Sequence, residues 1–265
     1  MAIVRLRAAD LRRAISDDAL SLQFQPQVHA PTGRLVGAEA FVRWPHPSYG
    51  MIGPGDIIPL VEQGGFHVDF DRWVLTALCA QVKRWNDEGF DVPVVSANIW
   101  AQTLRSPALT EMVRDIVLAS GVKGSAVEIE CPRGTVRDSA LAEAARRLRV
   151  LGVRVGSEEF GDPALADAAR DFDTLKIGYP VVRDLAAGDP AARDAVVAIV
   201  NAAHVVRTTT KGGVRVVADS VETPEQEDAL VALGCDIVQG YLYGPEVSAA
   251  ELRQLASMGA KRSAE

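Results

Sequence analysis

Short apolar runs alternate with amphipathic, helix-like stretches along most of this chain. The runs lie near residues 93–98, 126–130, 153–158, 173–177, 214–219 and 235–239. Apolar residues recur at helical spacing near 107–120, 136–151, 163–171, 190–206, 223–233 and 248–258. A strand followed by a helix, repeated, builds parallel β-α-β units. About eight strands without a long linker favour a closed α/β barrel over an open sheet.

The N-terminal part of the chain follows a different pattern. Residues 20–28 alternate apolar and polar side chains, a turn sequence occupies 31–33, and residues 34–44 form a second strand. We therefore expect a hairpin here. Helices are predicted at 10–17, 56–63 and 69–88, and Gly89 ends the last of them.

Polar side chains stand at or near the ends of many predicted strands. They are Asn98, Glu130, Glu158, Glu159, Asp219 and Gln239. Parallel strand ends that meet at one rim would gather these groups into an anionic pocket. Taken singly, a glutamate at a strand end is more often a solvated charge or a helix cap. Lys176 lies between Leu175 and Ile177 in an apolar strand, which favours an inward-facing side chain.

Charge and composition exclude several classes of protein. The 265 residues carry a net charge of -7, which argues against binding to nucleic acid or to an anionic membrane surface. The three cysteines form no CxxC pair and the four histidines no HExxH motif, so a zinc site is not expected. The cysteine usage indicates a reducing cytoplasm, and no apolar run approaches the roughly 18 residues of a membrane span.

One segment is far more specific than these patterns. Residues 38–65, AEAFVRWPHPSYGMIGPGDIIPLVEQGG, resemble the EAL-domain family, the cyclic di-GMP phosphodiesterases, whose pattern is EALxRW followed by HPxxGxIxPxxFIPLAExxG. The resemblance continues through FQPQ, SANIWAQTL, VEIE, LKIG, VVADSVETPEQ and LGCDIVQGYLYGP, and it spans about residues 10–250.

The resemblance implies a TIM-like (β/α)8 barrel whose first strand is antiparallel to the others. It implies a lead-in helix over 1–18, the EAL domain over 19–258 and a tail over 259–265. The site is expected at the carboxyl ends of the strands. There, family members use two divalent cations, Mg or Mn, to activate a water that opens one phosphodiester bond of cyclic di-GMP and yields pGpG.

The family's functional positions map onto named residues of this chain. The resemblance implies metal ligands at Glu39, Asn98, Glu130, Glu158 and Glu159, and catalytic roles for Lys176, Asp219 and Glu222. It implies ligand-binding roles for Gln25, Phe41, Arg43, Pro59 and Gln239. From the residues alone, Arg43 could also be an ordinary salt-bridge partner of a nearby acid, the less favoured alternative.

This sequence departs from the family pattern where the metals would bind. The family has two aspartates at Glu158 and Glu159, aspartate at Gly178, and glutamate at Asp219. It also has glycine at Ser220 and glutamate at Arg133, and its loop GTGYSSL is replaced by GDPALAD at 161–167, where Asp162-Pro163 predicts an early helix start.

These changes predict impaired chemistry. Lengthening Asp to Glu moves a carboxylate by about 1.5 Å, whereas catalytic geometry tolerates roughly 0.5 Å, and Mg²⁺ demands near-ideal coordination. Gly178 removes a carboxylate altogether. The leading hypothesis is therefore a degenerate EAL domain, with hydrolysis impaired or lost, that acts as a cyclic di-GMP-binding or protein-interaction module.

Two alternatives stay open at this point. The first is an active, metal-dependent phosphodiesterase that still converts cyclic di-GMP to pGpG. The second is a scaffold that binds no nucleotide. A homodimer is a family expectation, a protein partner is a further hypothesis, and neither nucleic-acid binding nor membrane insertion is predicted.

Overall fold

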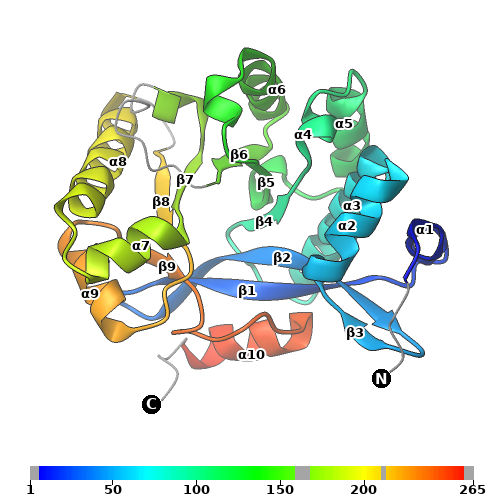
Figure 1. Cartoon of the computed structure of the whole chain (residues 1–265), viewed down its shortest axis with the longest axis horizontal. Helices are drawn as coiled ribbons and strands as arrows, with labels where there is room; N and C mark the ends of the chain where they lie inside the picture. Colours follow the sequence, from blue (N-terminus) through cyan, green and yellow to red (C-terminus); the bar gives the residue numbers. More distant parts are fainter. Residues whose placement is uncertain (1–5, 159–167, 210–212, 260–265) are drawn as a thin grey trace.

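A closed barrel forms the centre of the molecule (Figure 1). The computed structural model describes residues 6–158, 168–209 and 213–259. Within these ranges the barrel strands are β1 Ser21–His29, β2 Arg34–His46, β4 Val95–Asn98, β5 Val127–Cys131, β6 Arg154–Ser157, β7 Thr174–Ile177, β8 Arg215–Ala218 and β9 Ile237–Gln239. They follow the order β1-β9-β8-β7-β6-β5-β4-β2, and the β1–β2 pairing closes the ring. The prediction of a TIM-like barrel is confirmed.

The first strand runs against its two neighbours, as the sequence predicts. β1 pairs antiparallel with both β2 and β9, whereas the remaining barrel strands pair in parallel. The cause is local: the turn at 30–33 has Gly33 at φ 65, and a turn this short can only join antiparallel strands. A short strand, β3 Gly50–Ile52, pairs antiparallel with the C-terminal end of β2.

Helices surround the barrel in Figure 1. They are α1 Ala8–Ser16, α2 Pro54–Gly64, α3 His67–Asp87, α4 Ala101–Leu104, α5 Leu109–Ser120, α6 Ser139–Val150, α7 Tyr179–Ala186, α8 Pro190–Thr209, α9 Pro224–Ala232 and α10 Ala249–Met258. In the described ranges, none is both long enough and apolar enough to cross a bilayer.

Two described helices, the four-residue α4 and α7, were not predicted, and one predicted helix lies mostly outside the described residues. Helix α7 has Pro180 in its first turn, where proline is well tolerated although it suggests a loop in the sequence. The helix predicted at 163–171 falls largely on 159–167, outside the described residues, and so does the early start predicted at Asp162. Residues 168–171 form a short 3-10 segment.

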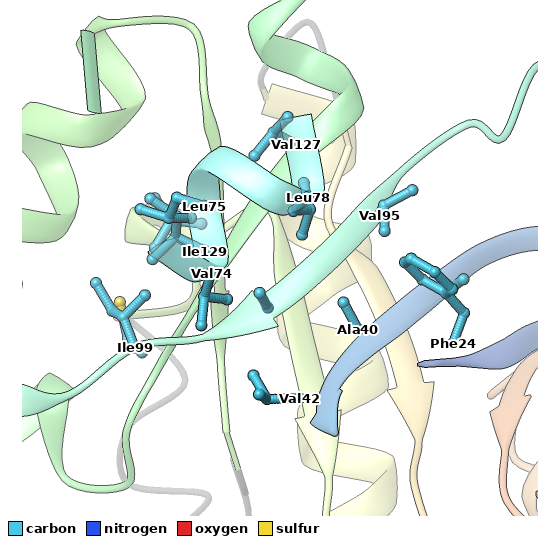
Figure 2. Packing of buried hydrophobic residues seen from close by; sticks show 14 of the residues in the cluster. Phe24, Ala40, Val42, Val74, Leu75, Leu78, Val95, Ile99, Val127 and Ile129 are labelled. Atoms are coloured by element: carbon cyan, nitrogen blue, oxygen red, sulfur yellow. The ribbon is translucent and has the colours of Figure 1, made fainter. Parts of the chain in front are cut away.

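The apolar core lies between the strands and the helices. Figure 2 shows Leu75 and Leu78 of α3 close to Val95 and Ile129 of the strands, and all four are buried. Apolar burial of this kind stabilises a fold by roughly 25 cal/mol for each Å² removed from water. The barrel is therefore held from outside its strands, which leaves its interior available for polar groups.

The lower interior of the barrel is polar and tightly bonded. Glu128 of β5 is fully buried, and its Oε2 accepts hydrogen bonds from Thr174 Oγ1 at 2.6 Å and Arg154 Nε at 3.1 Å. Arg215 Nη2 of β8 donates to Gln27 Oε1 of β1 at 2.8 Å. These bonds link strands that are adjacent or two apart in the ring, and they provide a fixed floor beneath the mouth.

Gly240 holds the segment after β8 against the end of β9. Val221 N donates to Gln239 O at 2.9 Å, and Leu242 N donates to Val221 O at 3.0 Å. Gly240 has φ 145, and a Cβ at this position would lie 2.3 Å from Val221 N and 2.3 Å from Val221 O. The close approach therefore requires glycine.

We expect Gly240→Ala to destabilise the protein by about 2–4 kcal/mol more than Gly244→Ala, because only the first substitution forces backbone atoms apart. Gly244 is the matched control, since it has φ 123 but open space around its missing Cβ. Urea unfolding monitored by circular dichroism measures the difference. Equal losses for the two variants would show that backbone strain alone decides the cost.

Candidate functional site

A buried lysine lies between two buried glutamates at the carboxyl ends of the strands. Lys176 Nζ of β7 contacts Glu39 Oε2 of β2 at 2.6 Å and Glu130 Oε2 of β5 at 2.9 Å. Each of the three residues is at most 3% exposed. Two carboxylates removed from water need a cation nearby, and Lys176 supplies it.

Glu39 is bonded on both of its oxygens. Asn98 Nδ2 donates to Glu39 Oε1 at 2.6 Å, and Gln239 Nε2 donates to Glu39 Oε2 at 2.7 Å. These amide orientations follow from the hydrogen-bond network. The strand register sets the position of Glu39 in the barrel. Glu39 lies opposite Gln25 of β1 on one side and Ser96 of β4 on the other.

Three glutamines connect this cluster to the barrel floor. Gln239 Nε2 also donates to Gln25 Oε1 at 3.0 Å, and Gln27 Nε2 donates to Gln239 Oε1 at 3.0 Å. Gln27 in turn accepts from Arg215. The chain of amides fixes the side chain of Glu39 from below, so that the geometry of the mouth is set by the barrel rather than by solvent.

Burial and charge act in opposite directions on the central groups. Burial by itself lowers the pKa of Lys176, but the carboxylates of Glu130 and Glu39 raise it well above its ordinary value. Burial and the neighbouring Glu39 raise the pKa of Glu130 to about 8, although Lys176 and the Ser96 hydroxyl favour its charged form. Neither Glu130 Oε1 nor Ser96 Oγ has a hydrogen bond of normal geometry among the described residues.

More acids surround the cluster at the rim. Asp219 Oδ2 is 4.0 Å from Lys176 Nζ, while its Oδ1 accepts a hydrogen bond from Ser220 N at 2.6 Å. Burial raises the pKa of Glu158, with Lys176 and Arg133 opposing this and Glu39 and Asp219 reinforcing it. Ser220 adopts φ 60, a left-handed conformation that a residue with a Cβ rarely takes.

Two clefts open above this cluster. The first has a volume of about 550 Å³, and its lining includes Phe41, Ile57, Ile58, Asn98, Trp100, Glu158 and Glu246. The second has a volume of about 340 Å³ and is lined by Gln25, Phe41, Tyr179, Asp219, Ser220, Glu222, Gly240, Tyr241 and Glu246. Phe41 and Glu246 line both clefts. Among the described residues, neither lining contains a lysine or an arginine.

The structure thus brings most of the predicted site residues to one mouth. Glu39, Asn98, Glu130, Lys176, Gln25 and Gln239 form one bonded cluster, and Asp219, Glu158, Glu222 and Phe41 lie along the clefts above it. Glu222 is exposed. Glu159 lies outside the described residues.

Two predicted ligand-binding residues do not line the clefts. Arg43 is buried and lines neither cleft; its Nε donates to Gln23 Oε1 at 2.7 Å and its Nη1 to Val42 O at 3.1 Å. Pro59 is exposed on α2, where Ile57 and Ile58 line the larger cleft instead. Their ligand-binding roles stay predictions.

Sequence reasoning missed Glu246. It follows β9 in a segment without periodicity, and its carboxylate lies 3.4 Å from Arg43 Nη2. The one signal in the sequence was its position just after the QGYLYGP motif, at the end of a strand that leads to the mouth. The Ser96 hydroxyl and the Gln27–Arg215 pair beneath the cluster also escaped notice, because buried polar residues in strands look like breaks in an apolar pattern.

The described residues do not fit a resident metal in this arrangement. Lys176 Nζ takes the position between Glu39 and Glu130 that a bridging cation would need, and Asn98 donates to Glu39 instead of presenting an oxygen. Within residues 6–158, 168–209 and 213–259, no three or more His, Cys, Asp and Glu side chains gather closely enough to hold a metal ion. Metal binding would require these side chains to rearrange.

Known proteins match the chain over nearly its whole length. The profile of the EAL domain matches residues 8–246. The bifunctional diguanylate cyclase/cyclic di-GMP phosphodiesterase MucR of Pseudomonas aeruginosa is 32% identical over 250 residues, which make up 92% of this chain and 35% of MucR. The oxygen sensor protein DosP of Escherichia coli is 30% identical over 252 residues, 92% of this chain and 30% of DosP. This chain spans about a third of the length of these curated relatives.

Solved structures of EAL domains also match the chain over most of its length. The PaMucR phosphodiesterase in complex with c-di-GMP superposes with a TM-score of 0.80 at 30% identity, covering 92% of this chain and 98% of that one. The Xanthomonas citri FimX EAL domain, in complex with c-diGMP, superposes with a TM-score of 0.79 at 19% identity, covering 91% and 93%. At that identity the second match supports the fold alone.

If Lys176 neutralises the two glutamates, removing its charge should be costly. We expect Lys176→Met to lower the free energy of unfolding by about 3–5 kcal/mol near neutral pH, because it leaves buried carboxylates without a partner. Lys83→Met is the control: Lys83 forms an exposed ion pair with Asp87, and such pairs contribute about 1 kcal/mol or less. Chemical denaturation of both variants measures the contrast, and a loss below about 1 kcal/mol for Lys176→Met would contradict this role.

Proposed function

This chain belongs to the EAL-domain family, and we propose that it binds cyclic di-GMP at the barrel mouth and hydrolyses it weakly or not at all. Binding and hydrolysis make different demands on the site. Binding needs a cleft of suitable shape with apolar walls, whereas hydrolysis needs metal ions held at fixed positions.

The two clefts support the binding part of the proposal. They meet at Phe41, and the larger is lined by apolar residues that include Ile57, Ile58 and Trp100. Tyr179 and Tyr241 line the smaller one. Paired clefts with aromatic walls suit a ring that carries two purine bases, since bases stack on aromatic side chains. Among ligands with two purine bases, we choose cyclic di-GMP because the chain belongs to the EAL-domain family.

The position of Lys176 carries the proposal that hydrolysis is impaired. In a two-metal mechanism, cations stabilise both the attacking and the leaving oxygen of the phosphodiester. Here an ammonium group lies between Glu39 and Glu130, and no carboxylate extends from Gly178, the N-cap residue of α7. A misplacement of about 1 Å can cost on the order of a hundredfold in rate. We therefore expect turnover far below that of an intact site.

One observation favours the alternative, an active metal-dependent phosphodiesterase. The carboxylates of Glu39, Glu130, Glu158 and Asp219 face a single ammonium group, and Glu130 Oε1 has no hydrogen bond of normal geometry. An excess of acid of this kind attracts divalent cations. Mn²⁺ or Mg²⁺ would then have to displace Lys176 before a reaction could occur.

The wider setting is proposed in the same way. We expect the domain to occupy residues 19–258, to work in the cytoplasm, and to act through a protein partner or a homodimer. Because the chain spans about a third of its relatives, the activity of any longer protein that contains it is a separate question.

The first test separates the three hypotheses. We expect calorimetric titration with cyclic di-GMP to give saturable 1:1 binding in EDTA, and excess protein with Mn²⁺ to release no pGpG detectable by chromatography. Conversion of the ligand to pGpG would establish the alternative enzyme. Absence of binding with and without Mn²⁺ would leave only the scaffold hypothesis.

The second test asks whether metal geometry is the defect. We expect the combined variant Glu158→Asp, Glu159→Asp, Gly178→Asp and Asp219→Glu to gain Mn²⁺-dependent turnover at least tenfold above the unmodified protein. The matched control carries Gly178→Asn in place of Gly178→Asp, which keeps the side-chain size and removes the charge. Equal activity of the two combined variants would contradict a role for the missing carboxylate.

A further inference from the structure

The clefts present mainly negative charge to an anionic ligand. Glu158, Asp219, Glu222 and Glu246 line them, and Arg133 lies near Glu158 without lining either cleft. A cyclic dinucleotide carries two phosphodiester anions. Arg43 is the cation that the family resemblance assigns to the ligand, and its guanidinium carbon lies 5.9 Å from the ring centroid of Phe41, which lines both clefts.

Arg43 already has an acidic neighbour. Two of its donors bond Gln23 and the Val42 carbonyl, and the third, Nη2, is 3.4 Å from Glu246 Oε1. The first two contacts lie along β1 and β2 and hold the guanidinium in place. Glu246 lines both clefts and contacts Arg43, whereas Arg43 lines neither, so an anion in the clefts meets the Glu246 carboxylate as a competitor for Arg43.

We infer that Glu246 competes with a ligand phosphate for Arg43 and thereby sets the affinity of the mouth for cyclic dinucleotides. The inference rests on the proposed function and assigns a specificity-determining role to a residue outside the predicted site. The ligand must displace the Glu246 carboxylate before its phosphate reaches the guanidinium.

Glu246 is built to move without disturbing the fold. The next residue is fixed, because Val247 N donates to Phe24 O at 2.9 Å and Phe24 N donates to Val247 O at 2.8 Å. The Glu246 side chain is 22% exposed, and its 3.4 Å contact is longer than the 2.7–2.9 Å typical of charge-assisted hydrogen bonds. A change of side-chain rotamer therefore breaks the pair while the backbone stays in register.

Removing the competing charge should tighten binding. We expect Glu246→Gln to lower the Kd for cyclic di-GMP by about tenfold, because it frees Arg43 and removes a repulsive charge. Glu246→Asp keeps the charge but shortens the side chain by one methylene, so that it reaches Arg43 poorly; we expect about a threefold decrease in Kd. Asp236→Asn is the control, since it removes one charge just before β9, at the opposite end of the strands.

Calorimetric titration of the four proteins in EDTA gives the answer. Tighter binding by both Glu246 variants, with Asp236→Asn unchanged, supports competition for Arg43. If only Glu246→Gln binds more tightly, general charge repulsion explains the effect and the inference is overturned. Equal affinity of all four proteins would also overturn it. Absence of binding by every protein would overturn the proposed function itself.

Discussion

The mouth of the barrel depends on the ion cluster of Lys176, Glu39 and Glu130. These groups come from three strands that are far apart in the sequence, and all are buried. Paired charges in a low-dielectric interior are tolerable only when the geometry is good and the remaining atoms are hydrogen-bonded. Asn98 and Gln239 satisfy the rest of Glu39, and the glutamine chain connects them to the polar floor. The contacts that fix Glu39 and Glu130 also hold the ammonium group of Lys176 at the centre of the mouth.

The proposed function separates recognition from chemistry. The ammonium group of Lys176 is held by two glutamates, whereas divalent ions at this place would activate a water molecule. The clefts above depend on other residues, chiefly Phe41 and the apolar side chains of α2. In the proposed function, the changes at the metal-ligand positions leave the shape of the binding surface intact. Glu246 has a separate proposed effect: it changes the charge that a ligand meets in the clefts, and it does not contribute to the Lys176 cluster below.

Much of the fold followed from the sequence, and the reasons are specific. The turn at 31–33 predicted the antiparallel first strand, and apolar runs separated by amphipathic stretches predicted the parallel ones. The inward direction of Lys176 followed from its apolar neighbours Leu175 and Ile177. Helix α7 was missed because Pro180 looks like a loop residue although it suits a first helical turn.

The electrostatic pairing at the mouth could not be predicted in the same way. The sequence allowed two interpretations of Arg43, as a ligand contact or as a salt-bridge partner. Its partner Glu246 lies near the other end of the chain, in a segment without periodicity. Pairings of this kind depend on how the barrel closes. Likewise, the position of the Lys176 ammonium group between Glu39 and Glu130 depends on side-chain geometry. The spacing of these residues along the chain does not encode that geometry.

The most direct measurement is anomalous diffraction from a crystal soaked with Mn²⁺ and cyclic di-GMP. Our account predicts ligand density over the two clefts, Lys176 still bonded to Glu39 and Glu130, and no manganese peak beside Glu39 and Asn98. A pair of manganese peaks there, with Lys176 displaced, would contradict it.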